Sequence, residues 1–92
     1  MAVLSPDEID RRLSSVPGWT RTDEGIRRQF TFTGFPEAVA FVTRLVEGAE
    51  AADHHPDVTS NYRRVTLVYS THSEGGVTEK DFTGAAMANA QA

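Results

Sequence analysis

A chain of 92 residues, 39% hydrophobic and 24% charged, is long enough for one small globular domain and too short for a second core. Its net charge of −4 disfavours a nucleic-acid surface, which usually needs a basic patch, and the absence of cysteine excludes disulfides, thiol nucleophiles and cysteine zinc sites. Residues 1–12 lack the pattern of a signal peptide, and no apolar stretch approaches membrane-spanning length. We therefore expect a cytoplasmic protein that binds neither nucleic acid nor membrane.

The first third of the chain predicts a helix followed by a β-hairpin. A capping-box pattern at residues 5–8 opens the helix, and Pro17-Gly18 ends it. Residues 19–24 and 26–32 have the composition of two strands, and the turn between them is centred on residues 23–25.

The middle of the chain predicts the longest helix, roughly residues 36–53. Pro56 is expected to stop it, because the residue before a proline avoids the helical conformation. Apolar residues recur at helical spacing along one stripe, which indicates a face packed on a core. The stripe consists of Ala38, Phe41, Val42, Leu45, Ala49 and Ala52.

The last third predicts a long strand, a very short strand and a final helix. Residues 62–71 are a β-prone run, and residues 57–61 are interpreted as a loop or the start of that strand. The very short strand follows a turn at residues 73–76, and Thr78 begins the helix. The order α-β-β-α-β-β-α predicts a single α+β domain, residues 1–92, with an antiparallel sheet covered on one face.

All three histidines of the chain are His54, His55 and His72. Histidine is the side chain whose ordinary pKa lets it give and take protons near neutral pH. The first two end the predicted long helix and the third ends the long strand, so all could reach the rim of one cleft. Glu50 and Asp53 add negative charge nearby, which favours protonated histidine. The group indicates acid/base chemistry.

Other interpretations of these histidines stay open. His54 or His55 could simply complement the dipole at the helix C-terminus. Three histidines could also bind zinc, although the spacing lacks the i, i+4 pair of a helical zinc site and adjacent histidines chelate one ion poorly. His72 could be only a polar residue at the end of a strand.

A spaced pattern in the second half of the chain includes all three histidines. It reads Glu50, three residues, His54-His55-Pro56, five residues, Tyr62, nine residues, His72, eight residues and Asp81. The pattern resembles the signature of the pterin-4a-carbinolamine dehydratases, and the resemblance covers nearly the whole chain. Similar residues outside the signature are Trp19, Phe35, Ala38, Phe41, Ala49, Val65, Thr71 and the run Gly75-Gly76-Val77-Thr78.

The resemblance implies a four-stranded antiparallel sheet with three helices packed on one face. It implies dehydration of 4a-hydroxytetrahydrobiopterin (pterin-4a-carbinolamine) to quinonoid dihydropterin and water, in the recycling of tetrahydrobiopterin for aromatic amino acid hydroxylation. It further implies a homodimer or homotetramer, with a metabolic link to phenylalanine hydroxylase. No metal or bound organic cofactor is needed for this reaction.

The same resemblance assigns roles to residues of this chain. The catalytic candidates are His54, His55 and His72, of which His54 and His72 share the acid and base roles and His55 holds or polarises the pterin. Ser73 stands where the family often has an acidic residue, so one contact of the pocket differs. The substrate-binding candidates are Glu50, Asp53, Pro56, Ser70, Thr71, Ser73 and Lys80.

A second function is open on the same fold, namely a non-catalytic binding or dimerisation scaffold. Animal relatives act as dimerisation cofactors of a transcription factor. A scaffold has no chemical need for three histidines, so the pattern favours the enzyme. In either case Arg64, Thr66, Val68 and the final helix are expected to contribute to an interface between subunits.

Overall fold

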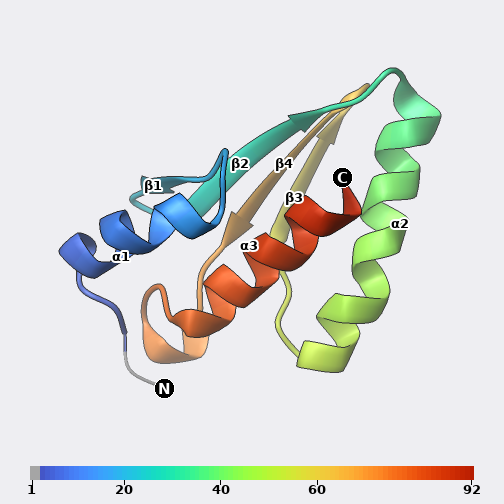
Figure 1. Cartoon of the computed structure of the whole chain (residues 1–92). Helices are drawn as coiled ribbons and strands as arrows, with labels where there is room; N and C mark the ends of the chain where they lie inside the picture. The colour runs from blue at the N-terminus through green and yellow to red at the C-terminus, as the bar shows by residue number, and fades with distance from the viewer. Residues whose placement is uncertain (1–2) are drawn as a thin grey trace.

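In residues 3–92, which the computed structural model describes, a four-stranded antiparallel sheet forms one layer and three helices form the other (Figure 1). The predicted α+β class and the order α-β-β-α-β-β-α are confirmed. The strands are β1 Thr20–Thr22, β2 Gly25–Thr31, β3 Asp57–Asn61 and β4 Arg64–Tyr69, in the sheet order β1-β2-β4-β3. The helices are α1 Pro6–Arg12, α2 Phe35–Ala52 and α3 Glu79–Gln91.

The first helix begins where the sequence predicts it, and the first hairpin also lies at the predicted place. The α-helix ends earlier than predicted, at Arg12, and a 3₁₀ turn, η1 Leu13–Ser15, continues toward Pro17-Gly18. The Ser5 hydroxyl accepts a hydrogen bond from the backbone N–H of Glu8 at the start of α1, while the Glu8 carboxylate pairs with Arg12, 3.1 Å away. In the hairpin, Gly25 has φ of 149°, and a side chain there would collide with the backbone carbonyl of Tyr69. Glycine therefore allows β2 to approach β4 closely at this point.

The long helix α2 packs on the sheet through four residues of the predicted stripe. Its end is set by Asp53, which takes a left-handed conformation with φ of 49°, and not by Pro56 three residues later. Ala52, expected on the buried stripe, is exposed because the last turn of α2 faces a cavity beside α3. The buried residues of the stripe are Ala38, Phe41, Leu45 and Ala49.

The second hairpin differs from the prediction. Residues 57–61 form a complete strand, β3, and the predicted long strand begins only at Arg64. Tyr62 has φ of 55°, so the polypeptide turns there and Asn61 pairs directly with Arg64. The very short strand expected after the glycine turn is only an isolated bridge between Thr71 and Gly76.

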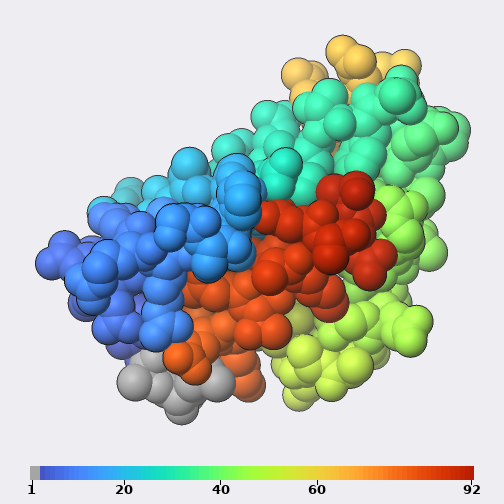
Figure 2. All heavy atoms as spheres, in the orientation of Figure 1, coloured from blue at the N-terminus to red at the C-terminus, as the bar shows by residue number. Residues whose placement is uncertain are grey.

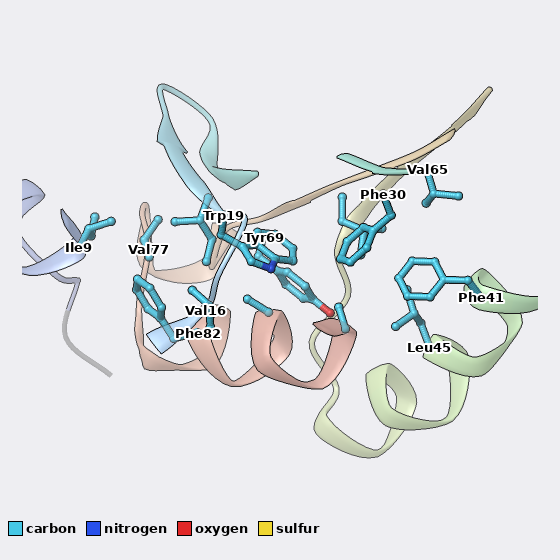
Figure 3. Close-up of a cluster of buried hydrophobic side chains, with 14 of the residues drawn as sticks. Ile9, Val16, Trp19, Phe30, Phe41, Leu45, Val65, Tyr69, Val77 and Phe82 are labelled. Atoms are coloured by element: carbon cyan, nitrogen blue, oxygen red, sulfur yellow. The ribbon is translucent and has the colours of Figure 1, made fainter. Parts of the chain in front are cut away.

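The core lies between the sheet and the helices and is rich in aromatic rings (Figure 3). β4 contributes its alternating face of Val65, Leu67 and Tyr69, each fully buried, as the period-two pattern predicts. Trp19 is also buried, and its ring lies 5.8 Å from that of Tyr69 and 6.1 Å from that of Phe30, measured between centroids. The aromatic core thus extends along the sheet to the end of β4.

The three helices lie side by side on the surface of the molecule. Figure 2 shows α3, in orange to red, between α1 in blue and α2 in green. None of the helices described in residues 3–92 is both long enough and apolar enough to cross a membrane.

Candidate active site

Three segments with predicted site residues meet at one end of the sheet. Asp57 at the start of β3 pairs with Val68 near the end of β4. Because the two strands are antiparallel, residues 54–56, which lead into β3, run beside residues 70–72, which leave β4. The N-terminus of α3 follows a few residues later. The fold therefore brings the helix-end histidines and His72 to the same end of the molecule.

His54 is held by a buried carboxylate. Its Nε2 lies 2.6 Å from Oδ1 of Asp81 in the first turn of α3. The Asp81 side chain is fully buried and the His54 side chain is 11% exposed. A hydrogen bond from Nε2–H to the carboxylate selects the tautomer of the imidazole and sets the direction of Nε2. The other ring nitrogen, Nδ1, makes no hydrogen bond to residues 3–92.

The second oxygen of the Asp81 carboxylate connects His54 to the segment that carries His72. Oδ2 accepts hydrogen bonds from the Thr71 hydroxyl and from the backbone N–H of Thr78, each at 2.9 Å. The Thr71 and Thr78 hydroxyls are also 2.7 Å apart. Since Thr71 directly precedes His72, one buried carboxylate positions both His54 and the start of the His72 turn.

Tyr69 lies against the His54 ring on the core side. The two ring centroids are 5.8 Å apart and their planes differ by 24°. The Tyr69 side chain is fully buried, and its hydroxyl has no hydrogen-bond partner in residues 3–92. Burial, aided by the negative charge of Asp81, raises the pKa of Tyr69 to about 12. The phenol is therefore neutral at any physiological pH.

His55 has a different environment from its neighbour. Its Nε2 lies 2.5 Å from Oε2 of Glu50, one turn earlier in α2, and the two side chains are 52% and 69% exposed. Both residues follow the end of α2, and their side chains point in different directions: His55 is exposed to solvent, whereas His54 contacts Asp81 of α3. An exposed pair of this kind can turn toward a ligand at little cost.

His72 begins a short 3₁₀ turn, η2, His72–Glu74. Its side chain is exposed and makes no hydrogen bond or ion pair within residues 3–92. The turn is closed by Gly75, whose backbone N–H donates to the carbonyl of His72. His72 is thus an accessible imidazole on a backbone that Thr71 holds in place.

The predicted substrate-binding residues border more than one cavity. His54 and Lys80 line a cavity of about 300 Å³ between the end of α2 and α3, together with Ala52, Glu79, Thr83, Gly84 and Met87. Glu50, His55 and Pro56 line another, of about 260 Å³, beside Val58 of β3. Ser70 lines a third, of about 320 Å³, near the β1–β2 turn.

The remaining predicted residues are placed as follows. Asp53 is the exposed left-handed residue that ends α2, and Ser73 is exposed in η2. The Thr71 side chain is buried, with its hydroxyl bonded to Thr78 and Asp81. Within residues 3–92 no three His, Asp or Glu side chains are grouped closely enough to hold a metal ion.

The site contains two residues that were not among the predicted site residues. Asp81 was part of the spaced pattern, but its position at the start of a helix explained it equally well as a capping residue. The signal that could have found it was its fixed spacing from His72. Tyr69 alternates with Val65 and Leu67 as an ordinary core residue does, so nothing in the sequence distinguished it.

Comparisons with known proteins identify the family of the chain. The sequence profile of the family described as Pterin 4 alpha carbinolamine dehydratase matches residues 2–91. A protein of Mycobacteroides abscessus provisionally named pterin-4-alpha-carbinolamine dehydratase is 49% identical over 81 residues, which cover 88% of this chain and 86% of the relative. One with the same name from Picosynechococcus is 51% identical over 79 residues, 86% of each chain.

A solved structure matches the fold over its whole length. It is described as a transcriptional coactivator/pterin dehydratase from Brucella melitensis, with a TM-score of 0.93, 39% sequence identity and coverage of 98% of both chains. The match of the family profile across the chain and the identity to its members give one conclusion. This protein belongs to the pterin-4-alpha-carbinolamine dehydratase family.

Proposed function

We propose that this protein catalyses the dehydration of 4a-hydroxytetrahydrobiopterin to quinonoid dihydropterin and water, by general acid and base catalysis from histidines. Membership of the dehydratase family supports the reaction class. The observation that carries the histidine mechanism is the bond between His54 and the fully buried Asp81 carboxylate, because it anchors an imidazole beside a cavity.

The reaction needs one proton donor and one proton acceptor. The hydroxyl on C4a leaves as water when an acid protonates its oxygen and the C4a–O bond breaks. A base removes the proton from N5, and the N5–H electron pair forms the new C=N double bond. No electrons are exchanged with an outside reagent, so two imidazoles suffice. Each can contribute about 10²- to 10⁴-fold to the rate.

In this proposal His54 and His72 are the acid and base, and Asp81 acts through His54 as a positioning residue. The exposed pair of His55 and Glu50 binds the pterin by its edge, with Pro56 beside it. Asp53, Ser70, Thr71, Ser73 and Lys80 shape the surroundings of the ring.

We also propose a cellular setting for this activity. The protein would act in the cytoplasm as a homodimer or homotetramer, regenerating tetrahydrobiopterin for an aromatic amino acid hydroxylase such as phenylalanine hydroxylase. The Brucella relative is described as a coactivator as well as a dehydratase. A scaffold role on this fold is therefore the second candidate, and measuring catalysis separates the two.

The test is stopped-flow dehydration of enzymatically generated 4a-hydroxytetrahydrobiopterin. The rate without protein is subtracted, because the substrate also dehydrates unaided. The proposal expects clear acceleration by the natural protein and a loss of at least about tenfold in His54→Ala and in His72→Ala. If the folded natural protein gives no acceleration, the proposed dehydratase activity on this substrate is excluded and the scaffold role remains as the candidate function.

A further inference from the structure

Tyr69 is the last ring of a continuous row of aromatic contacts in the core. From Phe30 the row passes to Trp19 and then to Tyr69, with centroid distances of 6.1 and 5.8 Å. His54 continues it at 5.8 Å, on the side of Tyr69 that faces the candidate site. In Figure 3 the Tyr69 side chain reaches from β4 toward α3, with Trp19 close beside it. The imidazole therefore lies against a ring that the core itself immobilises.

A glycine in α3 makes room for this ring. Gly84 lies inside the helix, where glycine is unfavourable relative to alanine. A Cβ at Gly84 would lie 2.5 Å from Cε1 and 2.6 Å from Cζ of Tyr69, closer than atoms can approach. Tyr69 could keep its present position beside His54 only if residue 84 has no side chain. The two residues form a matched pair.

The phenol hydroxyl does not explain the position of the ring. It is buried, and it makes no hydrogen bond to residues 3–92. A buried donor without a partner is unfavourable, so the contacts that hold Tyr69 are those of its ring. Those contacts include the nearly parallel face of His54.

We propose that Tyr69 is a positioning residue for His54, and that its buried ring fixes the plane of the imidazole while Asp81 fixes the direction of Nε2. The hydrogen bond to Asp81 alone leaves the imidazole free to rotate about the axis of that bond. The flat Tyr69 ring beside one face of the imidazole restricts this rotation. The inference rests on the proposed function for its effect on catalysis. It predicts an effect on the imidazole that can be measured whether or not the protein is a dehydratase.

The test compares Tyr69→Phe with Tyr69→Leu. Phenylalanine keeps the ring and removes only the unpaired hydroxyl, whereas leucine removes the flat surface. The imidazole nitrogens of His54 are observed by ¹⁵N NMR as the pH is varied. The natural protein and Tyr69→Phe should give the chemical shifts of one fixed tautomer, with the proton on Nε2. In Tyr69→Leu the imidazole plane can rotate, which should weaken the Nε2–H bond to Asp81 and give shifts averaged between the two tautomers.

Kinetics provide the second measurement. Tyr69→Leu should lower kcat about fivefold, change KM less than twofold and alter the pH profile of kcat. Tyr69→Phe should keep the kcat, KM and pH profile of the natural protein. A folded Tyr69→Leu protein with the His54 shifts and pH profile of the natural protein would overturn the proposal. If the natural protein shows no dehydratase activity, the proposed function fails, and the NMR comparison still decides whether Tyr69 positions His54.

A second variant keeps the inference testable if Tyr69→Leu fails to fold. Gly84→Ala displaces the Tyr69 ring and should produce the same averaged His54 shifts from a position on another helix. Ala86→Gly is the control, because it changes an exposed position of the same helix and should leave the His54 shifts unaltered. Natural His54 shifts in folded Gly84→Ala would contradict the proposal.

Discussion

His54 and Asp81 lie 27 residues apart in the sequence, and their side chains meet at 2.6 Å with the carboxylate wholly buried. The two oxygens of that carboxylate bind different segments: Oδ1 binds His54, which follows α2, and Oδ2 binds the Thr71 hydroxyl at the exit from β4. Asp81 therefore unites the elements that carry two of the three histidines.

Replacing Asp81 by asparagine should damage both stability and activity. The amide keeps the size of the side chain but loses the negative charge and one acceptor, so His54 or Thr71 is left without its bond. We expect the free energy of unfolding to fall by about 2 kcal/mol, from urea denaturation. The kcat for dehydration should fall at least about tenfold, because the imidazole of a proposed acid or base loses the carboxylate that orients it.

Asp10→Asn is the matched control for that change. Asp10 also accepts hydrogen bonds from a side chain, Arg21 at 2.9 Å, but the pair is exposed. Exposed ion pairs contribute at most about 1 kcal/mol, so this variant should remain near the natural protein in both measurements. Equal losses in the two variants would show that burial of Asp81 has no special role.

The pair of Glu50 and His55 should affect binding more than turnover. Both side chains are exposed, so Glu50→Gln should change the free energy of unfolding by less than about 1 kcal/mol. We expect His55→Ala to raise KM several-fold and to change kcat less than His54→Ala does. Steady-state kinetics on both variants provides the check, and a loss confined to kcat would reassign His55 to the chemical step.

Tyr69 should make the protein less stable in alkali. Its pKa of about 12 in the folded protein exceeds the ordinary value of about 10 for the unfolded chain. Above pH 10 the unfolded chain therefore binds fewer protons, so stability is complete below pH 10 and declines as pH rises toward 12. Urea denaturation from pH 9 to 12 should show this decline in the natural protein and a smaller one in Tyr69→Phe.

Asn89 should contribute to stability without contributing to the site. Its Oδ1 accepts hydrogen bonds from Trp19 Nε1 and Arg28 Nη1 at 2.8 and 2.7 Å, and its Nδ2 donates to the Pro17 carbonyl. Asn89→Ala leaves the buried indole N–H without an acceptor and should lower the free energy of unfolding by about 2 kcal/mol. Asn61→Ala, at an exposed position, should change it little. If Asn89→Ala changed the His54 NMR shifts as strongly as Tyr69→Leu does, the claim that Asn89 acts on stability and not on the site would be contradicted.

The strands show where sequence patterns stop being informative. β4 is half-buried, so its apolar residues alternate and its identity as a strand was predictable. All five residues of β3 are exposed, so the segment has no alternation and was interpreted as a loop or the start of a strand. Its structure depends on pairing with β4 across a turn at Tyr62, which takes a conformation that the sequence does not specify.

The site shows the same limit in its side chains. The spacing of the three histidines predicted which residues to examine, and the antiparallel hairpin explains why they gather at one end of the sheet. The packing of α3 beside the end of α2 decides which histidine contacts buried side chains. That packing joins His54 to Asp81 and Tyr69 and leaves His55 outside, although His54 and His55 are identical neighbours in the sequence.

The most direct test of histidine acid and base catalysis is the pH dependence of kcat for dehydration, corrected for the unaided reaction. The account predicts a bell-shaped profile in the natural protein, from which His54→Ala and His72→Ala each remove a different limb. A profile that stays flat, or that keeps both limbs in the two variants, would contradict the proposal that these imidazoles carry the protons.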